Sequence, residues 1–160
     1  MGDFLTADPA GDGRVFVEMS AGAARCLHQV AEDLLAALAP DSGEPGLADH
    51  DLFPDAYDTP DASEDFRRRH GGGMREEVTG AVWRVATEWQ GQPAFTMNRR
   101  AVWDWLITYG HAQAVFRRRR WEPDHEVWAR MPFDHEDVTA HWVPYVREAL
   151  IRALTTGTCG

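Results

Sequence analysis

The chain has 160 residues, an apolar content of 44% and a formal net charge of −10, which is the composition of one globular domain rather than of a disordered segment. All 16 basic residues are arginine, so chemistry that needs a lysine, such as a Schiff base or a Walker-A phosphate loop, is excluded. No apolar run reaches the roughly 18 residues of a membrane helix, and the N-terminus lacks the features of a signal peptide. We therefore expect a single cytoplasmic domain over residues 1–160.

Negative charge is concentrated in the first part of the chain. Residues 1–66 carry 15 acidic residues and 2 arginines. Phosphate binding needs a concentrated basic face, which this distribution does not favour. Neither nucleic acid nor a membrane is therefore expected as a partner.

The N-terminal segment has the pattern of a β-hairpin. Two β-prone stretches, at residues 4–6 and 14–19, flank turn-forming residues at 7–13. We predict a hairpin over residues 1–19. A lone hairpin is only marginally stable, so this one must pack against helices.

The first helix is predicted from Ala21 to Ala39. Ser20 is a good N-cap, Pro40 stops the helix, and apolar residues recur at the i, i+3, i+4 spacing of one helical face. Residues 41–58 are predicted to form an acidic loop. Three apolar side chains in that loop are expected to anchor it to the core: Leu52, Phe53 and Tyr57.

Two further helices are predicted on either side of a glycine run. Thr59 and Pro60 open a short helix that ends by His70, and residues 71–73 are three glycines that we interpret as a break. A second helix then runs over residues 74–90.

The last part of the chain predicts two more helices. Thr96 is interpreted as the cap of a helix that extends to about Arg119, and Asp134 as the cap of the final helix. Because Pro144 lies inside that final helix, a kink or a junction of two helices is expected near Val143. A flexible tail is predicted at residues 155–160. The fold class is an all-α bundle of four to five helices with a small N-terminal β-hairpin.

Three stretches resemble a known family. They are Leu-Phe-Pro-Asp-Ala-Tyr-Asp at residues 52–58 with Glu-Asp-Phe-Arg-Arg at 64–68, the Trp-Leu pair at 105–106, and the helix at 142–154. Together they resemble the actinobacterial domain of unknown function 2017 family, whose members are often encoded beside the adaptor of the Clp protease. The resemblance implies a cytoplasmic helical protein without assigned chemistry. Where members tend to carry Asn-Asp in mid-helix, this chain has Gly110 and His111.

That departure marks the candidate site. An imidazole in a partly dry aromatic pocket can act as an acid or base near neutral pH, so His111 is the leading catalytic candidate, with a structural role as the alternative. Asp104, seven residues earlier, lies on roughly the same helix face and is the second catalytic candidate. The candidate substrate-binding residues around them are Trp103, Trp105, Tyr109 and Gly110.

The tryptophans of this segment are informative by their spacing. Trp103 and Trp105 are two residues apart, so their side chains point about 200° apart on a helix. Both cannot belong to one apolar stripe. One of the two must therefore face a second surface, such as a partner, a ligand or the hairpin.

No metal or cofactor is expected. Histidines and carboxylates gather at residues 124–126, 134–137 and 141, but they lack the His-Glu-x-x-His and Glu-x-x-His spacings of helical metal ligands. Helix capping and surface ion pairing are the simpler interpretation.

Two classes of function remain open. The first is a small binding or accessory protein that acts through an aromatic groove, with a protein or peptide partner or a small hydrophobic or aromatic ligand; a homodimer is also open. The alternative is an acid–base enzyme without an organic cofactor, of cyclase or isomerase type, that uses His111 in a biosynthetic pathway.

Overall fold

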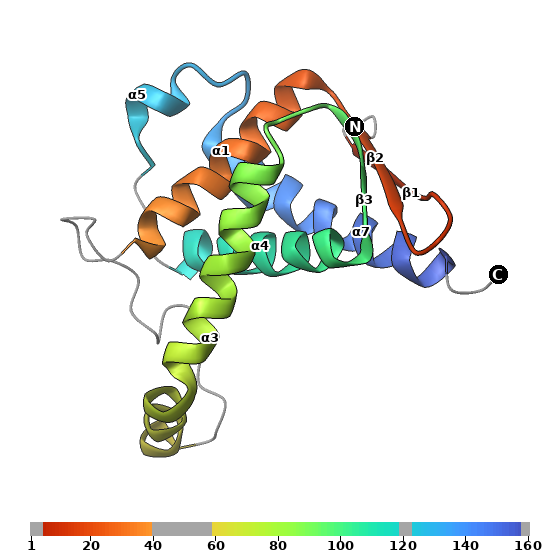
Figure 1. The fold of residues 1–160 in the computed structure, drawn as a ribbon. Helices are drawn as coiled ribbons and strands as arrows, with labels where there is room; N and C mark the ends of the chain where they lie inside the picture. The colour runs from red at the N-terminus through yellow and green to blue at the C-terminus, as the bar shows by residue number, and fades with distance from the viewer. Residues whose placement is uncertain (1–4, 40–58, 119–122, 158–160) are drawn as a thin grey trace.

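The computed structural model describes residues 5–39, 59–118 and 123–157, where helices predominate and three strands form one antiparallel sheet (Figure 1). The predicted helical bundle with its N-terminal hairpin is thereby confirmed. The predicted acidic loop at residues 41–58 lies outside the described residues. The elements are β1 (Leu5–Pro9), β2 (Val15–Met19), α1 (Ala21–Leu38), α3 (Pro60–Glu88), β3 (Ala94–Met97), α4 (Arg99–Arg118), α5 (His125–Trp128), α6 (His135–Asp137), a π-helical turn η1 (Val138–Trp142) and α7 (Val143–Gly157).

The sheet has the strand order β1-β2-β3. Leu5 of β1 lies opposite Met19 of β2, and Val15 of β2 lies opposite Met97 of β3. Alternate residues of β2 are buried, as the period of two in a strand requires. The hairpin therefore buries one face against the helices, and β3 joins it from a distant part of the chain.

Helix α1 follows the prediction closely. The Ser20 hydroxyl accepts a hydrogen bond from the backbone N–H of Ala23 at 3.1 Å, which is the expected N-cap, and the helix ends at Leu38. Its apolar stripe lies in the core. Tyr109 of α4 ties the two helices together, because its hydroxyl donates a hydrogen bond to the Leu27 carbonyl at 2.8 Å.

The break predicted at residues 71–73 is wrong. Helix α3 continues through all three glycines, and Figure 1 shows its first turns nearly end-on and its later turns from the side, so the helix changes direction along its length. The predicted cap is confirmed, since the Thr59 hydroxyl accepts from the Ala62 N–H. Five of the seven buried residues of α3 lie between Val78 and Ala86, where the helix packs on α1 and α4. That packing stabilises a helix which propensity alone would interrupt.

The predicted cap of α4 is also wrong. Thr96 belongs to β3, and the cap is Asn98, whose side-chain oxygen accepts from the Ala101 N–H at 2.8 Å. Asn98 is an equally good N-cap residue. The two-residue shift leaves room for a short strand between α3 and α4.

The last described part of the chain is helical, with one irregularity. Asp134 caps α6, and the junction expected near Val143 is confirmed as the π-helical turn η1 immediately before it. Pro144 has no N–H to donate, which favours a wider turn at this point. Residues 155–157 of the predicted tail are helical, because α7 extends to Gly157, and the rest of that segment lies outside the described residues. No helix in the described ranges has both the length and the apolar content needed to cross a membrane.

Candidate functional site

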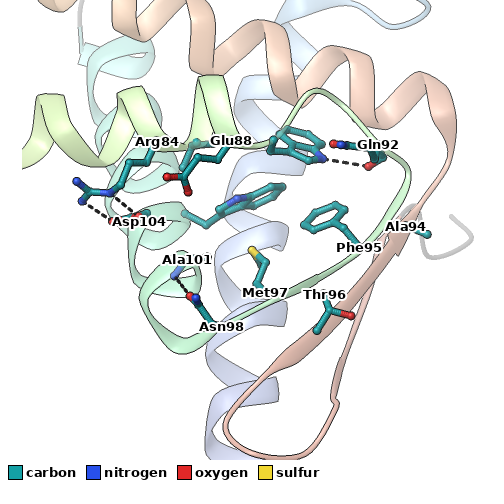
Figure 2. A pocket seen from close by; sticks show the side chains of 13 residues that line it. Arg84, Glu88, Gln92, Ala94, Phe95, Thr96, Met97, Asn98, Ala101 and Asp104 are labelled. Atoms are coloured by element: carbon teal, nitrogen blue, oxygen red, sulfur yellow. Dashed lines mark hydrogen bonds and ion pairs between the residues drawn. The ribbon is translucent and has the colours of Figure 1, made fainter.

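An open pocket of about 360 Å³ lies where α3, β3 and α4 meet (Figure 2). Its walls come from the last turns of α3 and the loop after it, from the whole of β3, and from the first two turns of α4. Pockets for small ligands occupy roughly 300–1,000 Å³, so this one has the size for one small ligand or for one or two side chains.

Three aromatic rings form the apolar wall of the pocket. The ring centroids of Trp89 and Trp105 are 4.7 Å apart, and the Phe95 centroid lies 5.5 Å from Trp89 and 5.4 Å from Trp105. The Trp89 indole N–H is satisfied by the Gln92 carbonyl at 3.0 Å. Phe95 is half-buried, whereas both tryptophans are buried. The wall is therefore packed into the core on its tryptophan side and accessible at Phe95.

An ion pair between two helices closes the polar end of the pocket. Arg84 of α3 donates two hydrogen bonds to Asp104 of α4, one to each carboxylate oxygen and both 2.8 Å long. Asp104 is 5% exposed. These hydrogen bonds raise the pKa of Arg84, and the nearby Glu88 carboxylate adds to the effect. Both oxygens of the Asp104 carboxylate are thus hydrogen-bonded to the Arg84 guanidinium. The exposed Glu88 carboxylate lies at the pocket rim (Figure 2).

Two of the six site residues expected from the sequence line this pocket, namely Asp104 and Trp105. The predicted divergence of the neighbouring tryptophans is confirmed, because Trp105 is 2% exposed and Trp103 is 53% exposed. Trp103 therefore points away from the core.

The other candidates lie further along α4. His111 is half-buried and stands seven residues from Asp104, which is about 10 Å along a helix axis. Tyr109 is fully buried and carries the hydrogen bond to α1 already described. Gly110 faces the Arg147 guanidinium, since a Cβ built there would lie 3.5 Å from Arg147 Nε. None of these three residues lines the pocket.

The histidine and carboxylate segments act locally as caps. The Asp124 side chain accepts from the N–H groups at the start of α5, and the Asp134 side chain does so for α6. Within the described ranges, no group of three or more His, Cys, Asp or Glu side chains is arranged to hold a metal ion.

A second polar cluster lies outside the pocket lining, between α1 and the segment before η1. Asp33 accepts hydrogen bonds from the Trp128 indole and from Gln29, both at 2.8 Å, and burial raises the pKa of its carboxyl. The His135 ring packs edge-on against Trp128, with centroids 4.7 Å apart. Burial lowers the pKa of His135, although Asp33, Asp134 and Glu136 oppose this shift.

Sequence reasoning missed the residues that complete the pocket. The sequence motifs discussed above single out none of Arg84, Glu88, Trp89 and Phe95 as a site residue. The available signal was the alternation of Phe95 and Met97 after Gly91 and Pro93, which is typical of a short strand after a turn. The interpretation of Thr96 as a helix cap conflicts with that signal, because a helix that starts after Thr96 leaves no room for the strand.

Comparison with known proteins assigns the chain to a family. No curated protein and no solved structure matches it. A family model described as a domain of unknown function (DUF2017) matches residues 3–154, which is nearly the whole chain. The resemblance seen in the sequence is confirmed, and the chain belongs to the DUF2017 family.

Proposed function

We propose that this chain is a binding protein whose pocket accepts an apolar, preferably aromatic, group. The observation that carries the proposal is the wall of three rings, Trp89, Phe95 and Trp105, around an open pocket. Aromatic rings attract one another in edge-on and offset arrangements and gain further from the burial of their large apolar area. A ring that enters beside Phe95 therefore finds contacts on several sides.

The polar groups of the pocket support binding rather than proton transfer. Binding pockets combine a mainly apolar lining with a few polar groups that orient the ligand. Here both oxygens of Asp104 are held by Arg84, so this carboxylate is ill placed to take a proton from a substrate. His111, the candidate acid or base, lies about two helical turns further along α4 and outside the pocket lining. The geometry thus favours the binding protein over the acid–base enzyme.

A titration with indole, followed by NMR of the tryptophan side-chain N–H groups, tests the proposal. We expect saturable shifts of the Trp89 and Trp105 signals. Phe95→Ala removes an accessible part of the wall and should weaken indole binding at least fivefold. Phe16→Ala is the matched control, because Phe16 is an exposed phenylalanine on the neighbouring strand and outside the pocket. Equal binding by both variants, or no saturable shift in the wild type, would overturn the proposal.

A further inference from the structure

Strand β3 has one edge that is paired and one that is open. The Met19 N–H donates to the Pro93 carbonyl at 2.8 Å, and the same register continues in steps of two, so Phe95 and Met97 provide the hydrogen bonds toward β2. The backbone N–H and C=O groups of Ala94 and Thr96 therefore point away from β2. In the described part of the chain, no strand pairs with that outer edge.

The open edge is a wall of the pocket. Every residue from Ala94 to Asn98 lines it, although successive side chains of a strand point to opposite faces. An unbroken run of lining residues means that the backbone edge itself borders the space. Figure 2 shows β3 passing along the pocket, with the side chains of Phe95 and Met97 on one side of the strand. The Phe95 ring packs there against Trp89 and Trp105.

The composition of β3 leaves its outer edge without two of the common protections of a strand edge. Exposed edges are commonly protected by charged side chains, prolines, short length or a covering element. Ala94–Met97 is short, but it contains neither a charged residue nor a proline. A row of alternating donors and acceptors beside an aromatic pocket is best satisfied by another extended chain, because only such a chain repeats both groups at the matching spacing.

We propose that the pocket binds an extended peptide segment, which adds as a fourth strand to β3 and inserts one apolar side chain into the pocket, against Phe95 and Trp105. The inference rests on the proposed function and names its partner class. The negative charge of Glu88 at the pocket rim favours a peptide that carries a basic residue beside the inserted side chain. Arg84 is occupied by Asp104, whereas in the described ranges Glu88 forms no ion pair and stands exposed at the rim.

Selection from a displayed library of random heptapeptides tests the inference, with Thr96→Pro and Thr96→Val as matched variants. Proline removes the outward N–H of Thr96 and leaves the hydrogen bonds to β2 in place, since these come from Phe95 and Met97. Valine keeps the N–H and the β-branched shape. We expect an enriched peptide with an apolar residue next to an arginine or lysine. It should bind Thr96→Val within twofold of wild type and Thr96→Pro at least tenfold more weakly.

A change in the peptide provides a second readout that leaves the protein intact. Two versions of the selected peptide are compared, one N-methylated at its odd-numbered residues and one at its even-numbered residues. Methylation should weaken binding at least tenfold in one version and much less in the other, because only alternate N–H groups of an added strand face β3. Glu88→Gln should weaken the basic peptide several-fold and leave a variant peptide without its basic residue unaffected. Equal binding of the two methylated peptides, together with equal binding of the unmethylated peptide by Thr96→Pro and the wild type, would overturn the strand addition.

The indole titration separates the two proposals. If indole binds in the pocket but no peptide is enriched, the aromatic pocket stands and the peptide inference fails. If neither indole nor a peptide binds, both fail. If sedimentation shows a dimer of the wild type that Thr96→Pro dissociates, the edge serves a second copy of the chain, and the peptide partner is wrong.

Discussion

Arg84 of α3 and Asp104 of α4 form a bidentate ion pair between the two helices, with both hydrogen bonds 2.8 Å long. The planar guanidinium matches the two carboxylate oxygens, which is the strongest geometry for such a pair. The pair joins α3 to α4 at the end of the pocket, so it sets the distance between two of the pocket walls.

Arg84→Met should lower the free energy of unfolding by about 2–3 kcal/mol, because it leaves the buried Asp104 carboxylate without its partner. Arg100→Met is the control. Its guanidinium approaches the same carboxylate only to 4.0 Å and its side chain is 66% exposed, so its loss should cost less than about 0.5 kcal/mol. Urea unfolding of both variants measures the difference, and equal losses would contradict the assigned role of Arg84.

The two neighbouring tryptophans of α4 should respond in opposite ways to truncation. Trp105→Ala empties the centre of the aromatic wall and should cost about 3–5 kcal/mol of stability. Trp103→Ala removes an exposed ring and should change stability by no more than about 0.5 kcal/mol. Thermal unfolding of the two variants checks this, and a large loss for Trp103→Ala would show that its ring is covered in solution.

Gly110→Ala should stabilise the protein by about 0.5–1 kcal/mol, because glycine is a poor residue inside a helix. The new Cβ would meet the Arg147 guanidinium at 3.5 Å, which is ordinary contact with the end of a flexible side chain. Gly73→Ala, in α3 with nothing within 4 Å of its Cβ, is the unhindered comparison. If calorimetry shows that only Gly110→Ala destabilises the fold, the space beside Gly110 is tighter than the structure indicates.

The free energy of unfolding should fall at mildly acidic pH, because His135 becomes protonated more readily in the unfolded chain than in the folded one. Burial lowers the pKa of His135 below its ordinary value of 6.5, so the unfolded chain binds a proton that the folded chain resists. This contribution is fully present above pH 6.5 and is lost as the pH falls toward the lowered pKa. Between pH 7 and pH 5, the wild type should therefore lose more stability than His135→Gln.

The control for this pH effect is a histidine on the surface. His125→Gln changes an exposed histidine of α5 and should retain the pH dependence of the wild type. Denaturant unfolding at several pH values gives the three curves. A His135→Gln curve parallel to that of the wild type would exclude His135 as the cause.

The sequence predicts an element well when neighbouring residues determine it, and poorly when contacts with distant residues do. Helix α1 was predictable almost to the residue, since its cap at Ser20, its apolar stripe and its stop at Pro40 are all local signals. Strand β3 was not, because its four residues become a strand only by pairing with β2, about 80 residues away. The glycine run was misread for the same reason, since packing of the later turns of α3 outweighs local propensity.

The candidate site shows the same division. Trp105 and Asp104 could be singled out, because the helix is rich in tryptophan and Asp104 lies seven residues before His111, on roughly the same helix face. The partner of Asp104 could not, since Arg84 lies on another helix and only the packing of α3 on α4 brings the two together. The proximity of His111 to an aromatic pocket was an expectation from sequence spacing. The structure places that histidine about two turns beyond the pocket.

The π-helical turn η1 accommodates one extra residue in the last helix. A π-helical turn holds one more residue than the α-helical turn it replaces. Deleting one residue within Val138–Trp142 would therefore let the segment close as a regular α-helix and leave α7 nearly unrotated relative to α6. Val146 and Leu150, both fully buried, would keep facing the core. A deletion in a regular turn of α7 would instead rotate the residues after it by about 100°, so the loss of one residue should be tolerated better in η1 than in α7.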